Sequence, residues 1–291
     1  MKRLQEVLMH RHELVIPAGA GSRRLLQALR DAYPGAPASL LRKSLQQRDI
    51  RINGVRIPAD QTVVPGDVIH WYTSWTPLDI EIVYEDEHLM VINKPAGLSS
   101  DARTPGAASA LGMVQARAAG AYEPRMVHRL DQMTSGLLVF GKDDHTANAL
   151  LAAFKERRIS KYYECIVGGE PKQHEMLRAY LIKDALHAEV RVTDRSVHGA
   201  KEICTEYRLL GKHEHGYRLS VTLHTGRTHQ IRAHLAYVGL PILGDDKYGD
   251  RMLNRTAKAK RMMLAAVEIR FDERGPLGYL SQVPLRIRAP F

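Results

Sequence analysis

Apolar and polar residues alternate in several short segments of the chain, a pattern typical of β-strands with one buried face. In residues 218–224, RLSVTLH, three apolar side chains share one face and three polar side chains share the other. Residues 162–169 and 267–271 alternate in the same way, and the apolar run LMVINKP ends at Pro95. These segments predict a sheet in the second part of the chain.

Apolar residues at helical spacing mark fewer segments. Residues 145–157 place one stripe on a helix, formed by Ala147, Leu150, Leu151 and Phe154. Residues 228–239 place a second stripe, formed by Ile231, Leu235 and Val238, and this helix is expected to end near Gly239. Many strands with scattered helices predict an α+β domain with a mixed, largely antiparallel sheet over residues 80–291.

Residues 13–73 predict a smaller α/β domain before it. Leu25, Leu26 and Leu29 indicate a first helix, and Ser39 is a candidate N-cap for a second. Asn53-Gly54 predicts a tight hairpin, because both positions of that turn require positive φ. Pro65-Gly66 predicts a further turn before a strand, and residues 73–79 are interpreted as a linker.

Length and charge narrow the class of protein. A chain of 291 residues suggests about two domains, and a net charge of +10 favours nucleic acid as the partner, with an anionic membrane surface next. No stretch of roughly 18 apolar residues predicts a membrane span, and the first residues are too charged for a signal peptide. Cys165 and Cys204 show no motif spacing, which favours reduced, packed thiols in a cytoplasmic protein.

The sequence gives little support for a metal site or for a nucleotide-cofactor site. His224, His229 and His234 are five residues apart, about 500° around a helix, so they do not align. There is no H-E-x-x-H or C-x-x-C, and neither GAGS nor GDDKYG forms a phosphate-binding loop. We therefore expect no metal site and no cofactor, with some histidines facing RNA phosphates or holding turns. Acidic pairs such as residues 245–246 are interpreted mainly as solvated turns.

Two stretches stand out against this background. In HRLDQMTSGLLVFGK, His128, Arg129 and Asp131 fall within four residues just before a strand. In LHTGRTHQIRAHL, Arg227 follows a glycine where a strand gives way to a helix, a place suited to face a carboxylate or a phosphate. Each stretch alone also fits an ordinary loop with surface cations, but the two together in a basic chain favour a functional site.

HRLDQMTSGLLVFGK resembles the signature of the RluA-type pseudouridine synthases, in which the Asp of H-R-L-D is catalytic. Four further stretches resemble segments of the same family, namely residues 84–98, 157–169, 223–249 and 260–271. Residues 39–69 are similar to an S4 RNA-binding domain. The first helix departs from the S4 pattern, because RRLLQ stands where that domain usually has R-L-D.

The resemblance implies cofactor-free isomerisation of uridine to pseudouridine in structured RNA, above all 23S ribosomal RNA, by a monomer without a membrane partner. Two alternatives stay open at this point. One is a transfer-RNA uridine as the target, and the other is a non-catalytic RNA-binding or ribosome-assembly protein that keeps the fold.

The resemblance also implies roles for single residues. Asp131 would be the nucleophile, attacking either C1′ of the ribose or C6 of the uracil. Arg129 would fill the gap left when the target base leaves its stack. Tyr163 would stack on the flipped base and take a proton late in the reaction, with Tyr162 as the competing assignment. Arg227 would pair with Asp131 and hold it ionised, which desolvation alone would oppose.

Four other residues are weaker candidates for contact with RNA. His128 and Arg232 are expected to make RNA or structural contacts. Arg42 and Lys43 crowd the polar face of the second predicted helix, and in a small basic domain they are expected to meet the RNA backbone.

Overall fold

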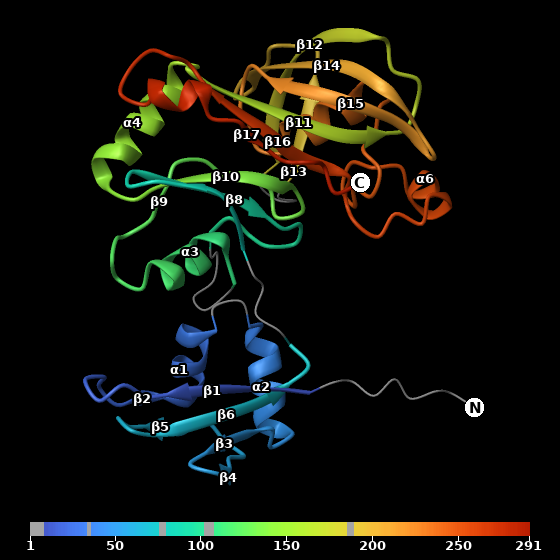
Figure 1. Ribbon diagram of the computed structural model, residues 1–291. Coiled ribbons are helices and arrows are strands. Elements are labelled where there is room, and N and C mark those ends of the chain that lie inside the picture. Colours follow the sequence, from blue (N-terminus) through green and yellow to red (C-terminus); the bar gives the residue numbers. More distant parts are fainter. Residues whose placement is uncertain (1–8, 34–35, 76–79, 102–107, 185–188) are drawn as a thin grey trace. The chain divides into compact units, whose positions relative to one another are not determined.

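A computed structural model describes residues 9–33, 36–75, 80–101, 108–184 and 189–291 (Figure 1). The chain divides into two compact units. The first comprises Met1–Ile80 with Asp101–Glu123, and the second comprises Glu81–Ser100 with Pro124–Phe291. Residues 101–123 thus group with the N-terminal segment. The predicted limits of an S4-like domain at 13–73 and a catalytic domain at 80–291 remain predictions.

The first unit contains small sheets and helices. Its four-stranded sheet has the order β1-β6-β3-β4, formed by β1 (His10–Val15), β6 (Val68–Thr73), β3 (Ile50–Ile52) and β4 (Val55–Arg56). A separate pair is formed by β2 (Arg23–Arg24) and β5 (Thr62–Val63). The helices are α1 (Leu25–Ala32), α2 (Ala38–Gln46) and α3 (Ala110–Ala118). Both predicted helices are confirmed, but α2 begins at Ala38 after Pro37, so Ser39 is not its N-cap.

The two predicted turns of this unit are confirmed. Asn53 and Gly54 have φ of 51° and 85°, and they join β3 to β4 as a two-residue hairpin loop. Gly66 has φ of 90°, and the N–H of Asp67 donates to the carbonyl oxygen of Val64 across the second turn. Both features depend on local backbone chemistry, which explains why sequence alone identifies them.

The predicted linker begins inside the packed unit. Thr73 is the last residue of β6, and the Trp75 ring stacks on the buried Trp71 ring with centroids 5.4 Å apart. The Trp71 Nε1–H donates to Ser44 Oγ at 2.9 Å, which ties the strand to α2. Residues 76–79 of the predicted linker lie outside the described residues.

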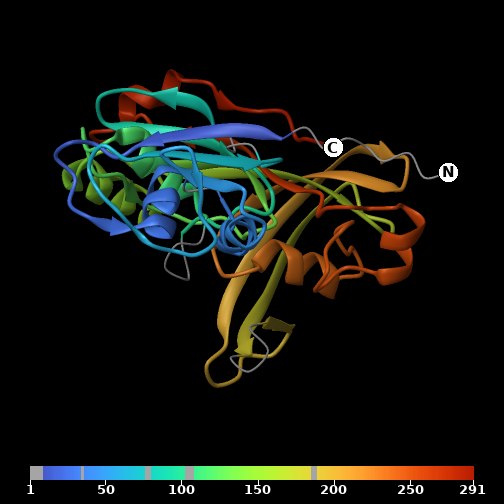
Figure 2. The ribbon, with the colours of Figure 1, turned by 90° about the horizontal axis from the view of Figure 1, so that it is seen from below.

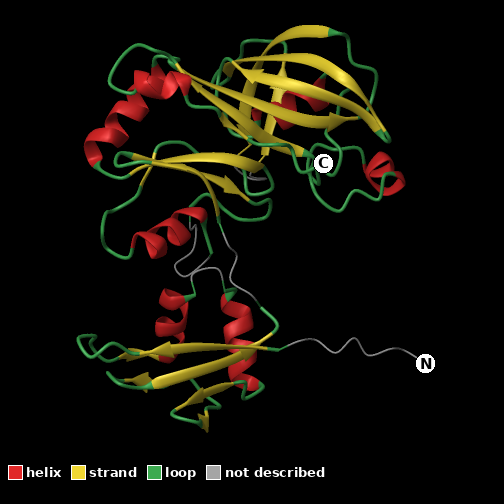
Figure 3. Ribbon diagram, in the orientation of Figure 1, coloured by secondary structure: helices red, strands yellow, loops and turns green. Residues whose placement is uncertain are grey.

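The second unit is built around an eleven-stranded sheet (Figure 3). Its main path is β13-β12-β14-β15-β11-β16-β10-β8-β7, while β9 pairs with β10 and β17 with β16. Its strands are β7 (Glu81–Glu85), β8 (Leu89–Lys94), β9 (Arg125–Met126), β10 (Ser135–Gly141), β11 (Ile159–Val167), β12 (His174–Asp184), β13 (Glu189–Thr193), β14 (Lys201–His213), β15 (Gly216–Leu223), β16 (Leu264–Phe271) and β17 (Leu285–Arg286). Among the strand pairs that the structure describes, only β10–β16 is parallel. This confirms the predicted α+β class with a mixed, largely antiparallel sheet.

A close contact between strands explains one glycine of the H-R-L-D-x-x-T-S-G stretch. All seven residues of β10 are buried, and Gly136 is paired with Ala266 of the parallel β16. Gly136 has φ of 113°, and a Cβ built there would lie 2.2 Å from the carbonyl oxygen of Ala266. Only glycine fits this close approach, so the residue fixes the packing of β10 on β16.

Helices complete the second unit. They are α4 (Asp144–Lys155), α5 (Gln230–Tyr237), α6 (Arg251–Thr256) and the 3₁₀ helix η1 (Gly278–Gln282). Asp143 caps α4, since its carboxylate accepts the N–H of Thr146 at 2.7 Å. Leu150 is buried as predicted, but Leu151 is 48% exposed, so its placement on the apolar stripe is wrong. No described helix is both long and apolar enough to cross a membrane.

The far end of the sheet extends as an arm. Strands β12 and β14 run antiparallel from the pair His174–Arg208 to the pair Leu181–Lys201, and β13 pairs with β12 (Figure 2). The middle of this sheet, at β11, β16 and β10, carries segments that resemble the pseudouridine synthases.

Candidate active site

The loop between β9 and β10 carries Asp131 and is held by hydrogen bonds. Ser100 Oγ accepts the N–H of Leu130 at 3.0 Å and donates to its carbonyl oxygen at 2.8 Å. The N–H of Thr134 donates to the carbonyl oxygen of Asp131 at 3.0 Å, which closes a tight turn before the strand. The Asp131 side chain is 25% exposed. Its carboxylate is therefore positioned by a fixed backbone and is still reachable from outside.

The cation that faces Asp131 is Arg232. Its Nη1 lies 3.6 Å from Asp131 Oδ2, and its side chain is 5% exposed. Arg227, which we expected to form this pair, is exposed, and its N–H donates to Gln230 Oε1 at 3.0 Å. No ion pair links Arg227 to Asp131 in the part of the chain that the structure describes. The expected pair is corrected, because Arg227 lies in the turn before α5 whereas Arg232 lies on the buried side of that helix.

Of the RNA or structural contacts expected for Arg232, the structure shows structural ones. Its Nε and Nη2 donate to the two carboxylate oxygens of Asp245 at 2.8 and 2.7 Å. The guanidinium also lies 5.2 Å from the centre of the Tyr248 ring. With its donors directed at protein carboxylates and its side chain buried, Arg232 is built into the site and is not presented to an RNA backbone.

Lys94 is a buried cation beneath the same loop that sequence reasoning missed. Its Nζ donates to the carbonyl oxygens of Leu98, Pro95 and Gln132 at 2.7, 3.1 and 3.1 Å. Burial lowers the pKa of Lys94 to about 8, against the opposing charge of Asp131. A lysine at the end of the apolar run LMVINKP was the available signal. The ammonium group of Lys94 links the turn after β8 to the loop that carries Asp131.

Tyr163 lies on β11 close to Asp131, whereas Tyr162 lies on the other face. Tyr163 is 5% exposed, and burial, followed by the charge of Asp131, raises the pKa of its phenol. The Tyr162 ring is instead covered by Arg270, whose guanidinium carbon lies 4.8 Å from the ring centre. The register of β11 against β16 shifts between these two tyrosines. Of the two candidates, the structure brings Tyr163 to the site.

Of the RNA or structural contacts expected for His128, the structure shows structural ones. Its Nε2 accepts the N–H of Val139 at 3.1 Å, and its Nδ1 is buried. Its ring packs on Phe154, with centroids 4.9 Å apart. Burial, helped by the charge of Lys161, lowers the pKa of His128 well below its usual value. A neutral imidazole thus ties the Asp131 loop to β10.

Arg129 stays on the outside of the loop. It is exposed, while its neighbour Leu130 is 7% exposed and points into the protein. The alternation places Arg129 and the Asp131 carboxylate on the accessible part of one short loop.

Asp245 and His229 are further site residues that the sequence pattern did not identify. Asp245 is 2% exposed, which corrects its interpretation as part of a solvated turn. His229 lies in the left-handed region with φ of 54° and its Nδ1 is 3.0 Å from Tyr248 Oη. Burial lowers the pKa of His229, while the charge of Asp131 opposes that shift. Tertiary packing brings both residues to the site, and the sequence pattern did not indicate this role for either of them.

The histidines that we considered as metal ligands each face a different partner. His224 Nε2 lies 2.8 Å from Glu206 Oε2, and His234 Nδ1 lies 2.9 Å from Thr205 Oγ1. Among the residues described by the structure, no group of three or more His, Cys, Asp or Glu side chains is placed to hold a metal ion. These histidines serve as hydrogen-bonding groups of the sheet and of the start of α5.

The family model of RNA pseudouridylate synthase matches residues 88–237, a range that contains Asp131, Tyr163 and Arg232. This chain belongs to that family. The match covers about half of the sequence and includes the loop that carries Asp131 and the helix that carries Arg232. The protein is therefore an RNA pseudouridine synthase, an isomerase.

Several named proteins are similar to this family member along most of its length. It is 31% identical to the ribosomal large subunit pseudouridine synthase C of Vibrio vulnificus (strain CMCP6), over 92% of this chain and 89% of that protein. It is 32% identical to the ribosomal large subunit pseudouridine synthase D of Xylella fastidiosa (strain Temecula1), over 96% of this chain and 88% of that protein. The solved structure of Human RNA Pseudouridylate Synthase Domain Containing 1 has a TM-score of 0.60 and 25% identity, covering 73% of this chain and 84% of that one.

Proposed function

We propose that this pseudouridine synthase acts on large-subunit ribosomal RNA and that Asp131 is its nucleophile. The ion pair with the buried Arg232 is the observation that carries the assignment of Asp131. The guanidinium places a fixed positive charge 3.6 Å from the carboxylate that would attack the nucleotide. The names of the bacterial relatives support the choice of RNA.

The reaction needs no electron acceptor and no group donor. The C1′–N1 bond of the uridine breaks, the freed uracil turns, and a new bond joins C1′ to C5, with the C5 proton lost and a proton gained at N1. A transient bond from Asp131 Oδ to the nucleotide holds one fragment while the other turns. The carboxylate is regenerated when the C–C bond forms, so atoms and charge balance without a cofactor.

Arg129 and Tyr163 fit the two tasks that base flipping creates. A flipped nucleotide leaves a gap in its helix and needs a surface on which its base can stack, and the exchange costs a few kcal/mol. Arg129 is exposed two residues before Asp131, where its planar guanidinium suits the gap. Tyr163 offers an aromatic ring beside Asp131. Its raised pKa favours the neutral phenol, which supports stacking over the role of a phenolate base.

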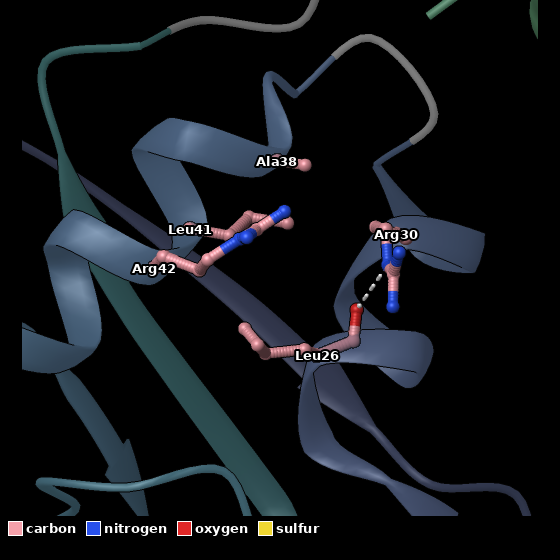
Figure 4. Close-up of a pocket in the computed structure, with 5 residues that line it drawn as sticks. All are labelled: Leu26, Arg30, Ala38, Leu41 and Arg42. Carbon is pink, nitrogen blue, oxygen red and sulfur yellow. Dashed lines mark hydrogen bonds between the residues drawn. The ribbon is translucent and has the colours of Figure 1, made fainter. Parts of the chain in front are cut away.

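The first unit supplies exposed cations that suit contact with the RNA backbone. Arg42 and Lys43 are adjacent and exposed on α2. Arg42 lines a cleft of about 250 Å³ together with Leu26, Arg30, Ala38 and Leu41 (Figure 4). The Arg30 Nε–H donates to the carbonyl oxygen of Leu26 at 3.1 Å on the other side of this cleft. Paired cations beside an apolar floor match the phosphates and unpaired bases of RNA. We propose that this surface adds affinity that does not depend on sequence.

The assignment of Asp131 is tested by Asp131→Asn, which keeps the shape and removes the carboxylate. We expect the variant to lose release of tritium from C5-labelled uridine in RNA while its affinity for the same RNA changes less than about threefold. Substantial turnover by the variant would overturn the nucleophile. The RNA class is tested by mapping pseudouridine in all stable RNAs of a strain that lacks the gene. Loss of a site from transfer RNA in place of large-subunit ribosomal RNA would overturn that part.

A further inference from the structure

We infer that Asp245 is a positioning residue for catalysis, because it fixes the guanidinium that faces Asp131. The inference rests on the proposed function, in which Asp131 is the nucleophile. Asp245 does not face the accessible side of the site, since its side chain is fully buried. It acts through Arg232, and this separates its role from that of Asp131.

The geometry around Arg232 is asymmetric. Two of its nitrogens meet the two oxygens of Asp245 at 2.8 and 2.7 Å, the paired arrangement that best fixes the plane of a guanidinium. Nη1 is left to point at Asp131, and it lies 3.6 Å from Oδ2. The short, paired contact therefore sets the plane, and the longer contact is the one that is free to change during the reaction.

The carboxylate of Asp245 is itself held from the backbone. Its Oδ1 accepts the N–H groups of Lys247 and Tyr248 at 2.9 and 3.1 Å. Burial would raise the pKa of Asp245, but the hydrogen bonds and charge of Arg232, together with these N–H groups, lower it. The group thus stays anionic beside Arg232, and a fixed anion is what a fixed guanidinium requires.

The charge balance explains why a second carboxylate is useful. Arg232 carries one positive charge, and Asp245 can neutralise it within a dry part of the protein. Asp131 is then not bound in a tight pair of its own, and its carboxylate can leave the guanidinium to attack the nucleotide. A direct two-bond pair between Arg232 and Asp131 would instead hold the nucleophile in place and cost reactivity.

Asp246 provides a matched control on the same guanidinium. Its Oδ1 lies 3.3 Å from Arg232 Nη2, but its side chain is 80% exposed and solvent screens its charge. Asn254 provides a control for the loop itself. Its Nδ2 donates to the backbone carbonyl oxygen of Asp245 at 3.0 Å and does not involve the carboxylate.

The test compares Asp245→Asn, Asp246→Asn and Asn254→Ala in the full-length protein. It measures single-turnover tritium release with saturating enzyme and, separately, affinity for the same RNA transcript. We expect Asp245→Asn to lower the rate constant by about 10- to 100-fold with little change in affinity, as misplacement of a reacting group does. We expect less than about a threefold change for Asp246→Asn. Asn254→Ala should lower the Tm but reduce the rate constant less than Asp245→Asn does.

A double-variant cycle with Arg232→Lys isolates the route of action, at a temperature where circular dichroism shows all four proteins folded. If Asp245 acts through Arg232, adding Asp245→Asn to Arg232→Lys should lower the rate constant by less than a further factor of about three. Losses that multiply would overturn the inference, as would equal losses for Asp245→Asn and Asp246→Asn. Full activity of Asp245→Asn beside an inactive Asp131→Asn overturns only the positioning role. Turnover by Asp131→Asn overturns the nucleophile on which it rests.

Discussion

The guanidinium of Arg232 lies 3.6 Å from the carboxylate of Asp131, although the two residues belong to separate stretches of the chain. Asp131 comes from the loop before β10, and Arg232 comes from α5, which follows β15. The contact unites the two sequence motifs in one site. It also places a buried positive charge beside Asp131, where solvent screens the attraction between the two groups least.

The first prediction concerns this buried charge. Arg232→Gln leaves the buried Asp245 without its partner, so we expect the free energy of unfolding to fall by about 3–5 kcal/mol. Arg227→Gln, at an exposed position, should change it by less than about 0.5 kcal/mol. Urea denaturation followed by circular dichroism measures both values. Similar stabilities for the two variants would contradict the assignment of Arg232 as the structural and electrostatic partner.

The second prediction separates the two adjacent tyrosines. Tyr163→Phe keeps an aromatic ring beside Asp131 and removes the hydroxyl, so we expect the single-turnover rate to stay within about threefold of the parent. Tyr163→Leu removes the stacking surface and should lower the rate by about 10- to 100-fold, which matches the loss of one stacking interaction of about 1–3 kcal/mol. Tritium release from labelled RNA measures the rates.

Tyr162→Leu is the control for this comparison, because its ring lies on the other face of β11 under Arg270. We expect it to affect the rate far less than Tyr163→Leu. A larger loss for Tyr162→Leu would transfer the stacking role to Tyr162. A large loss for Tyr163→Phe would show that the hydroxyl takes part in proton transfer.

Local signals predicted much of the fold. The hairpin at Asn53-Gly54 and the strand β15 follow from backbone preference and from alternation over a few residues, and both are present in the structure. Leu151 shows the limit of a periodic pattern. It was placed on the apolar stripe of α4, but the helix buries the side that carries Ala147, Leu150 and Ala153. A stripe shows which residues can be buried, and only packing decides which ones are.

The sequence motifs of the site could be predicted, but the pairs that its charged residues form could not. Asp131 was found because a short motif carries it, whereas the choice of Arg232 over Arg227 depends on how α5 lies against the sheet. Lys94 and Asp245 are buried charges whose charged partners lie far away in sequence, Asp131 for Lys94 and Arg232 for Asp245. No residue next to them in sequence reveals those partners.

The third prediction concerns the surface on α2. Arg42→Ala combined with Lys43→Ala removes two exposed cations, so we expect the slope of log K against log salt concentration to become shallower by about two if each meets a phosphate. Filter binding to an RNA transcript from about 50 to 300 mM salt, roughly a sixfold range, measures the slope. The fold should be unchanged, because both side chains are exposed.

Arg11→Ala combined with Arg56→Ala removes the same charge from the edge strands β1 and β4 of the same unit. We expect this variant to change the slope much less. Equal effects of the two pairs would show that net charge matters and position does not, and this would contradict a specific binding surface on α2.

The fourth prediction is a pH dependence of stability that arises from His234. Its side chain is 1% exposed, and burial lowers its pKa from 6.5 to about 4 in the folded protein. Between these values the unfolded chain binds a proton that the folded protein does not. The free energy of unfolding therefore falls as pH falls from 6.5 to 4, by about 3 kcal/mol from this group. Below pH 4 both states are protonated, and the contribution stays lost.

A series of urea denaturation curves between pH 4 and 7.5 measures this effect as the difference between the parent and His234→Gln. That difference should shrink as pH falls from 6.5 to 4, because the variant has no imidazole to protonate on unfolding. His128, whose pKa is also lowered, contributes equally to both proteins and cancels. His198→Gln, at an exposed position, should follow the parent at every pH. Parallel curves for the parent and His234→Gln would show that His234 is protonated equally in both states, and the burial of a neutral imidazole beside Thr205 would then be wrong.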